Sequence, residues 1–197
     1  MTPLAVPCHD AILAPTEPMR SRGSMVQESE SPAVLGISGW HNSGKTALVE
    51  ALVTALCAEG LSVCTIKHAA RGLDVDEPGS DSWRMWEAGA HAVVVAGPDQ
   101  LLVRERRTEP SLSDALGRLE GRCDVILVEG FKRERLPRVV IQVAGTEPLP
   151  EGDAVCVVHT GKEGLRRESG ALSGALSGAL SGAVEAVIGW LRGMHFV

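Results

Sequence analysis

Short runs of apolar residues alternate with longer amphipathic segments along most of the chain. The runs are apolar at nearly every position, which is typical of strands buried on both faces of a parallel sheet. Strands are predicted at residues 33–38, 61–66, 91–96, 100–106, 123–130, 138–143 and 154–159. Because helical segments separate many of these strands, the pattern predicts an α/β fold with three layers, α/β/α, around a mostly parallel sheet.

Three helices are predicted between these strands, at residues 43–59, 80–89 and 111–120. Gly60 follows the first helix in the position where a residue without Cβ ends many helices. Ser111 and Asp114 have the spacing of a reciprocal cap at the start of the third helix. The apolar face of the first helix consists of Leu48, Leu52, Ala55 and Leu56.

A hairpin is predicted in the middle of the chain. Residues 91–96 and 100–106 flank a Gly-Pro-Asp turn at residues 97–99, and two apolar runs around such a turn favour antiparallel pairing. We expect this pair to form a short antiparallel extension at one edge of the sheet.

Both ends of the chain differ from its centre. Residues 1–32 are rich in Pro, Ser and Glu without periodicity and predict a disordered tail, and a folded domain is expected at 33–160. Residues 161–197 contain a repeated Ser-Gly-Ala-Leu unit followed by a helical segment. Each glycine of the unit costs about 1 kcal/mol in a helix interior. We therefore expect a weak helix until residues 187–191. The repeat places Leu172, Leu176, Leu180 and Val184 four residues apart.

Composition narrows the possible partners. The formal net charge is −6 and aromatic residues make up 3% of the chain, which argues against nucleic-acid and membrane-surface binding. No apolar run approaches the roughly 20 residues that span a bilayer, and the N-terminus lacks the pattern of a secretory signal. The five cysteines form no Cys-x-x-Cys pair. We expect a cytoplasmic protein.

The octet "GWHNSGKT", residues 39–46, has the spacing of a phosphate-binding P-loop, the Walker A motif. A predicted strand precedes it and a predicted helix follows it, which is the context that the motif requires. Gly39 and Gly44 allow a tight turn around phosphate oxygens, and successive N–H groups at the helix start bind the anion. Lys45 is expected to contact the outer phosphates and Thr46 to bind Mg²⁺. The motif predicts a P-loop NTPase fold.

Charged residues end two further predicted strands. Glu129 follows "DVILV" at the edge where ligands bind in open α/β sheets, and an acidic residue there typically contacts Mg²⁺. An ordinary strand-end charge is the alternative. Lys67 and His68 follow the second strand at the same edge, and Asp76 and Asp81 come shortly after. Carboxylates near a nucleotide coordinate metal or orient a nucleophile, whereas a histidine at such an edge is equally compatible with a structural role.

These segments together resemble a known family, the MobB adaptor of molybdopterin-guanine dinucleotide biosynthesis. The resemblance rests on the P-loop, on "IKH" at 66–68, on "DEPGSDS" at 76–82, on "AGA" at 88–90 and on "VEGFK" at 128–132, in this order. It covers residues 33–143. It implies a GTP-binding homodimer with weak GTPase activity that assists the MobA-type guanylyltransferase which attaches GMP to molybdopterin.

The motif and the resemblance assign roles to particular residues. Lys45 is expected to act on the β- and γ-phosphates, and Asp76 or Asp81 to position water or the metal. Thr46 and Glu129 are the expected ligands of Mg²⁺. The expected nucleotide-binding residues are Gly39, Trp40, His41, Asn42, Ser43, Gly44, Lys45, Thr46, Ala47, Lys67 and His68.

Three questions stay open at the level of sequence. A small-molecule kinase with the same core is the alternative function, and the basic segment 131–138 would then supply its lid. That segment is otherwise either a solvated surface loop or a contact for a pterin phosphate or an acidic partner. The choice of guanine rests on the resemblance alone, because the last strand is followed by Glu163 and by no aspartate.

Overall fold

A computed structural model describes residues 31–70, 72–73, 75–150, 153–162, 165, 174–194 and 196. The predicted disordered tail lies outside this part of the chain up to residue 30, as do Glu163 and Leu172. No helix among the described residues is long and apolar enough to cross a membrane.

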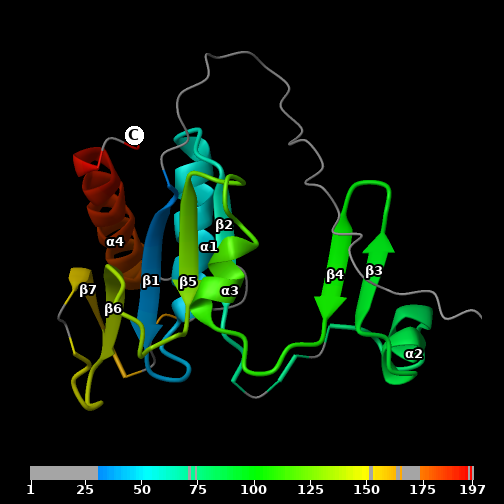
Figure 1. Cartoon of the computed structure of the whole chain (residues 1–197). Helices are drawn as coiled ribbons and strands as arrows, with labels where there is room; N and C mark the ends of the chain where they lie inside the picture. Colours follow the sequence, from blue (N-terminus) through cyan, green and yellow to red (C-terminus); the bar gives the residue numbers. More distant parts are fainter. Residues whose placement is uncertain are drawn as a thin grey trace, which may run out of the picture. The chain divides into compact units, whose positions relative to one another are not determined.

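The centre of the fold is a five-stranded sheet in which every neighbouring pair is parallel. Its order is β2-β5-β1-β6-β7, with β1 in the middle (Figure 1). The strands are β1 (Ala33–Gly39), β2 (Val63–Lys67), β5 (Val125–Glu129), β6 (Arg138–Val143) and β7 (Ala154–Thr160). Their apolar and β-branched residues suit strands that are covered on both faces. The predicted parallel sheet is confirmed, and all five carboxyl ends lie at one edge.

Helices cover the two faces of this sheet, as predicted, and complete an α/β/α arrangement. On one face α1 (Lys45–Ala58) and α4 (Gly174–Gly193) pack together against the strands, and on the other lies α3 (Leu112–Gly117) (Figure 1). The side chains of Leu48, Leu52 and Leu56 are fully buried in the first layer. Leu112 packs in the second layer with Ile126 and Val128.

The first helix begins two residues later than predicted. Gly44 has φ 93°, a left-handed conformation that an α-helix cannot contain, so α1 begins at Lys45 rather than Ser43. The end of the helix is as predicted, because Gly60 has φ 88° and its N–H donates to the carbonyl of Cys57 at 3.0 Å. The late start follows from the P-loop, whose turn must be completed before helical dihedrals begin.

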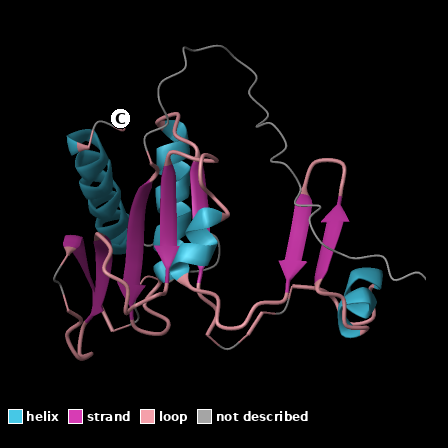
Figure 2. Ribbon diagram, viewed as in Figure 1, coloured by secondary structure: helices cyan, strands magenta, loops and turns pink. Residues whose placement is uncertain are grey.

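The predicted hairpin is present as β3 (Ala92–Ala96) and β4 (Leu101–Glu105), with α2 (Asp81–Glu87) before it. It does not take the predicted place at the edge of the main sheet. Its strands pair with each other and with no other strand among the described residues, so they form a separate two-stranded sheet (Figure 2). Only Val93 is buried within it. The prediction missed this because the alternation of residues fixes strands but not which strands pair.

Helix α4 begins within the repeat at Gly174, where the glycines predict only a weak helix up to residues 187–191. A four-residue unit advances about 40° beyond one helical turn, so a strict four-residue stripe rotates away from the sheet. The residues that face the core therefore follow a spacing of three and four. They are Leu180, Ala183, Val187 and Leu191, each no more than 3% exposed. Packing against α1 and β7 offsets the low helix propensity of the glycines.

Leu52 provides a test of this core. It is fully buried between the sheet and the two helices of its layer. We expect Leu52→Ala to lower the free energy of unfolding by about 2–5 kcal/mol, measured by urea denaturation. Leu73→Ala is the matched control, because that side chain is 69% exposed, and its effect is expected to stay within about 0.5 kcal/mol. Equal effects of the two changes would contradict the assigned core.

The cap of α3 gives a pH-dependent test. Asp114 accepts hydrogen bonds from the Ser111 hydroxyl at 2.6 Å and the Ser111 N–H at 2.9 Å, and these bonds hold the pKa of the Asp114 carboxyl below its usual value of 3.8. A carboxyl with a lowered folded-state pKa stabilises the fold above pH 3.8, and this contribution is lost as the pH falls through the lowered pKa. Asp114→Ala is therefore expected to destabilise the protein at pH 7 and much less at pH 2. A constant difference across this range would refute the cap.

Candidate functional site

The carboxyl ends of three neighbouring strands bring the predicted site residues together. The P-loop follows β1, Glu129 ends β5 and Lys67 ends β2. Because β5 lies between the other two strands, Glu129 pairs in register with Ile37 on one side and with Lys67 on the other. The topology thus places a carboxylate and an ammonium beside the P-loop, although the three segments are far apart in the sequence.

The P-loop backbone forms an open anion site. Asn42 and Gly44 have φ values of 60° and 93°, and between them the N–H of Ser43 donates to the Trp40 carbonyl at 3.2 Å. Gly44 is the N-cap of α1, and no side chain caps that helix. The N–H groups of the first turn are therefore left for a ligand, and they carry the positive end of the helix dipole.

Close packing explains why glycine is required at two positions of this loop. A Cβ on Gly39 would collide with the hydroxyl of Ser43, which is itself buried and has no hydrogen-bond partner among the described residues. A Cβ on Gly44 would collide with the backbone of Leu165, whose N–H donates to the Ser43 carbonyl at 3.0 Å. Leu165, which follows β7, thus rests directly on the P-loop.

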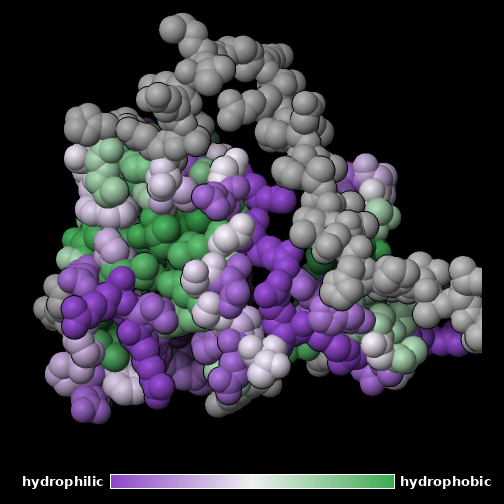
Figure 3. All heavy atoms as spheres, in the orientation of Figure 1, coloured by the Kyte–Doolittle hydropathy of each residue, from purple (hydrophilic) through white to green (hydrophobic). Residues whose placement is uncertain are grey.

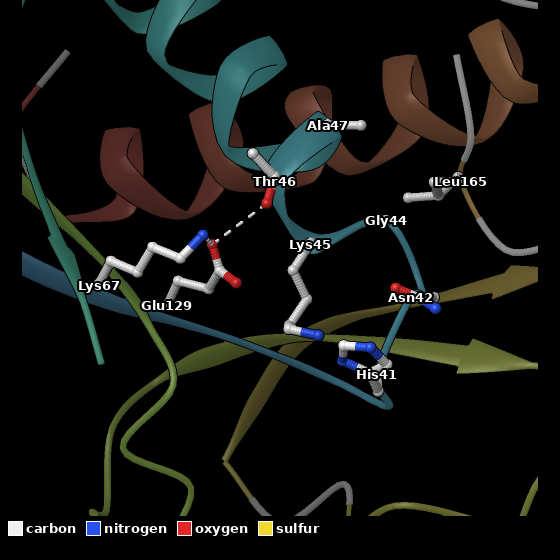
Figure 4. Close-up of a pocket in the computed structure, with 9 residues that line it drawn as sticks. All are labelled: His41, Asn42, Gly44, Lys45, Thr46, Ala47, Lys67, Glu129 and Leu165. Atoms are coloured by element: carbon white, nitrogen blue, oxygen red, sulfur yellow. Dashed lines mark hydrogen bonds and ion pairs between the residues drawn. The ribbon is translucent and has the colours of Figure 1, made fainter. Parts of the chain in front are cut away.

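Three functional side chains converge on Glu129 and the P-loop (Figure 4). The Thr46 hydroxyl donates to Glu129 Oε2 at 3.4 Å, and Lys67 Nζ lies 3.7 Å from the same oxygen. Lys45 Nζ donates to the Trp40 carbonyl at 2.7 Å, so its ammonium is held over the loop rather than in solvent. The expected grouping of Lys45, Thr46, Glu129 and Lys67 is therefore present.

The electrostatics of Lys45 fit an anion site. Burial lowers the pKa of this side chain, the nearby ammonium groups of Lys132 and Lys67 lower it further, and the carboxylate of Glu129 opposes them. Positive charge is thus gathered in a partly buried place with one carboxylate as counter-charge. A bound phosphate chain would relieve this repulsion and favour the charged form of Lys45.

These side chains border a cavity of about 640 Å³, a size within the usual range for a small-molecule site. Figure 4 shows its two ends. Lys67 and Glu129 lie at one end, and Leu165 lies at the other with Ala47 near the helix start. One end is therefore charged, whereas the other offers apolar contacts. The lining residues are His41, Asn42, Gly44, Lys45, Thr46, Ala47, Lys67, Glu129 and Leu165.

The oxygen atoms near Glu129 fit a Mg²⁺ ion that is bound together with phosphate. Mg²⁺ prefers oxygen ligands and is commonly held by one or two protein oxygens plus phosphate oxygens and water. The Thr46 hydroxyl and the Glu129 carboxylate supply such a pair, and they lie within hydrogen-bond distance of each other. In the described part of the chain no group of three or more His, Cys, Asp or Glu side chains forms a metal cage.

Six predicted residues are not among those that line the cavity: Gly39, Trp40 and Ser43 of the P-loop, and His68, Asp76 and Asp81. Asp76 accepts hydrogen bonds from Ser82 and Arg104, each at 3.1 Å, and its side chain is only 9% exposed. Asp81 is an exposed residue in the first turn of α2. His68 packs its ring against Phe131 at 4.6 Å. In a single chain Asp76 therefore holds its own segment, which precedes α2, to β4. A catalytic role for Asp76 or Asp81 stays a prediction.

Leu165 near the cavity escaped the prediction, and Lys132 was predicted only as part of the basic segment 131–138. Leu165 lines the cavity from the segment after β7, and Lys132 lies close enough to act on the pKa of Lys45. A signal for both exists in the strand order, because segments that follow parallel strands meet at one edge. That signal requires knowing that β6 and β7 lie on the far side of β1, which the local pattern does not reveal.

Comparisons with known proteins agree with this geometry. The family model described as Molybdopterin guanine dinucleotide synthesis protein B matches residues 34–160. The chain is 40% identical over 123 residues to the molybdopterin-guanine dinucleotide biosynthesis adapter protein of Haemophilus influenzae, which covers 61% of this chain and 69% of that protein. With the protein of the same name from Escherichia coli it shares 37% identity over 122 residues, 60% of this chain and 70% of the other.

Solved structures show the same fold. A crystal structure of molybdopterin-guanine biosynthesis protein B (mobB) superposes with a TM-score of 0.57 at 25% identity, over 81% of this chain and 99% of that one. The crystal structure of Bacillus subtilis MobB gives 0.53 at 27% identity, over 76% and 96% of the two chains. Since the family model also spans more than half of the sequence, the chain belongs to the molybdopterin guanine dinucleotide synthesis protein B (MobB) family.

Proposed function

We propose that the protein binds GTP with Mg²⁺ at its P-loop and serves as an adaptor in the attachment of GMP to molybdopterin. The observation that carries the proposal is the convergence of Lys45, Thr46, Lys67 and Glu129 at the uncapped start of α1. Four groups of this chemistry at one cavity match a nucleotide phosphate chain better than any neutral ligand.

Each group then has a distinct task. The N–H groups of the first turn of α1 hold phosphate oxygens, and Lys45 bridges from the Trp40 carbonyl to the outer phosphates. Thr46 and Glu129 would hold Mg²⁺, which neutralises charge between neighbouring phosphates. Lys67 contributes a second ammonium and keeps the Glu129 carboxylate oriented through their 3.7 Å contact.

The nucleoside occupies the opposite end of the cavity in this proposal. Ala47 and Leu165 offer apolar contacts there, and Leu165 is fixed by its hydrogen bond to Ser43. Apolar walls hold a base but do not distinguish guanine from adenine. The choice of GTP is therefore supported by membership in the family, and it is the first point to test.

Hydrolysis is expected to be slow. Glu129 is the one carboxylate among the described residues that line the cavity, and its oxygen is engaged by Thr46 and Lys67. Asp76 is engaged by Arg104 and Ser82. A P-loop without a free group to orient the attacking water turns over slowly. This favours a nucleotide-dependent adaptor over a fast small-molecule kinase.

Relatives support the biological setting. The proteins of Haemophilus influenzae and Escherichia coli are both named adapter proteins of molybdopterin-guanine dinucleotide biosynthesis. By this relationship the partner is a MobA-type guanylyltransferase with molybdopterin as its substrate, and the setting is the cytoplasm.

A homodimer is the proposed state, and the hairpin is its proposed contact. An isolated two-stranded ribbon is marginally stable in water, yet β3 and β4 expose apolar side chains on both faces. Figure 3 shows hydrophobic atoms at the surface of this segment, at the right of the view. A second copy of the chain would cover them with an equally apolar ribbon. The exposed side chains are Val94, Val95, Leu101, Leu102 and Val103.

Nucleotide competition tests the central claim. We expect the unaltered protein with Mg²⁺ to bind GTP more tightly than ATP, measured by displacement of a fluorescent guanine nucleotide. Lys45→Ala should weaken binding by roughly 10- to 100-fold, because it removes a charge-assisted contact to phosphate. Circular dichroism of the variant controls for folding. Tighter binding of ATP than of GTP would contradict the guanine assignment, while leaving the P-loop site in place.

The dimer has a separate test. Val94 and Val103 face each other across the hairpin, and each is 52% exposed. We expect a change of both residues to glutamate to halve the mass found by light scattering, because like charges would meet in the apolar contact. Met194→Glu, at an exposed position after α4, should leave the mass unchanged. An unaltered protein that is monomeric at all concentrations would exclude the dimer.

A further inference from the structure

The loop after β5 has an unusual backbone that aims it at the P-loop. Gly130 and Phe131 have φ values of 100° and 46°, and the second is rare for an aromatic residue. A Cβ on Gly130 would lie 2.6 Å from the Cβ of His68, so this close approach requires glycine. The ring of Phe131 is held against His68 at 4.6 Å. These two residues shape the start of the loop after Glu129, from which Lys132 extends.

Lys132 emerges beside the P-loop residue Trp40. Its Nζ lies 5.4 Å from the centre of the Trp40 ring, within range of a cation–π contact. The ring is itself fixed, because its Nε1 donates to the carbonyl of Glu147 at 2.8 Å. The carbonyl of the same tryptophan accepts a hydrogen bond from Lys45 at 2.7 Å. Trp40 thus holds two ammonium groups at once, one on its ring and one on its backbone.

The charge around the cavity is unbalanced without a ligand. Besides burial, the ammonium groups of Lys132 and Lys67 lower the pKa of Lys45, and the carboxylate of Glu129 opposes them. Among the described residues, Glu129 is paired with Lys67, and Lys45 and Lys132 form no ion pair with a carboxylate. An exposed cation–π contact is weak compared with a charge-assisted hydrogen bond to phosphate. A phosphate oxygen would therefore draw the Lys132 ammonium away from the Trp40 ring.

The direction of the cavity identifies which phosphate lies nearest. The nucleoside fits the apolar end with Ala47 and Leu165, so the phosphate chain runs toward Glu129 and Lys67 (Figure 4). Lys132 belongs to the loop that leaves the sheet directly after Glu129. The group closest to that loop is the terminal phosphate of a triphosphate, and a diphosphate would end before it.

We propose that Lys132 is a binding residue for the terminal phosphate, and that its ammonium leaves the face of Trp40 to contact this phosphate when a nucleoside triphosphate is bound. The proposal rests on the proposed nucleotide binding and adds a residue that distinguishes triphosphate from diphosphate. The long flexible stem and three donors of lysine suit such a movement. The Lys132 ammonium is then the cation that contacts the terminal phosphate. The loop after β5 changes its contact with Trp40 when that phosphate is present.

The test compares two guanine nucleotides by isothermal titration calorimetry in the presence of Mg²⁺. The ligands are the slowly hydrolysed guanosine 5′-[γ-thio]triphosphate and GDP, and the variants are Lys132→Ala, Lys132→Arg and the control Arg135→Ala in the same exposed loop. Lys132→Ala is expected to weaken triphosphate binding about tenfold, the loss of one charge-assisted contact, and to leave GDP binding within about twofold. Lys132→Arg should keep most of the triphosphate affinity, and Arg135→Ala all of it.

The unchanged GDP affinity of Lys132→Ala also shows that this variant is folded. Equal weakening of both nucleotides, or no weakening of either, would overturn the role of Lys132 while leaving nucleotide binding in place. An equal loss in Arg135→Ala would overturn it as well, because the effect would then belong to the general charge of the loop. If the unaltered protein bound neither nucleotide, the proposed function and this inference would both be refuted.

Discussion

The pairing of β5 with both β1 and β2 is the constraint on which the site depends. This pairing places Glu129 between the P-loop and Lys67, and it starts the loop of Lys132 at the same edge. A shift of β5 by one residue would turn Glu129 to the other face of the sheet. An apolar side chain of β5 would then lie beside the charged groups at the P-loop. The buried residues of β5, each 1% exposed or less, fix the register and so fix the chemistry.

Much of this fold follows from local sequence. The strands, the P-loop, the end of α1 at Gly60 and the cap of α3 were predictable because each depends on neighbouring residues. The separate hairpin was not, because strand pairing is a long-range choice. A weak helix was expected across the repeat, and contacts of α4 with α1 and β7 offset the low helix propensity of its glycines.

The site divides in the same way. Lys45 and Thr46 could be assigned from motif spacing, and Glu129 from its place at a strand end. Asp76 was expected near the nucleotide on the basis of charge, but Arg104 lies in β4 and its 3.1 Å ion pair is invisible in the local pattern. Leu165 and Lys132 reach the cavity from loops whose neighbours are set by strand order. Motif spacing therefore identifies side chains that belong to the P-loop segment itself. The strand order is needed to identify side chains that reach the cavity from loops after other strands.

The central position of β1 has a consequence for how the chain acquires this site during synthesis. β1 is the first strand in the sequence, but its partners β5 and β6 are made much later, and Leu165, which rests on the P-loop, follows β7. The cavity at the P-loop therefore cannot be complete until the chain has been made at least as far as Leu165. A nascent or truncated chain would carry the P-loop sequence without the packing that Leu165 adds to it.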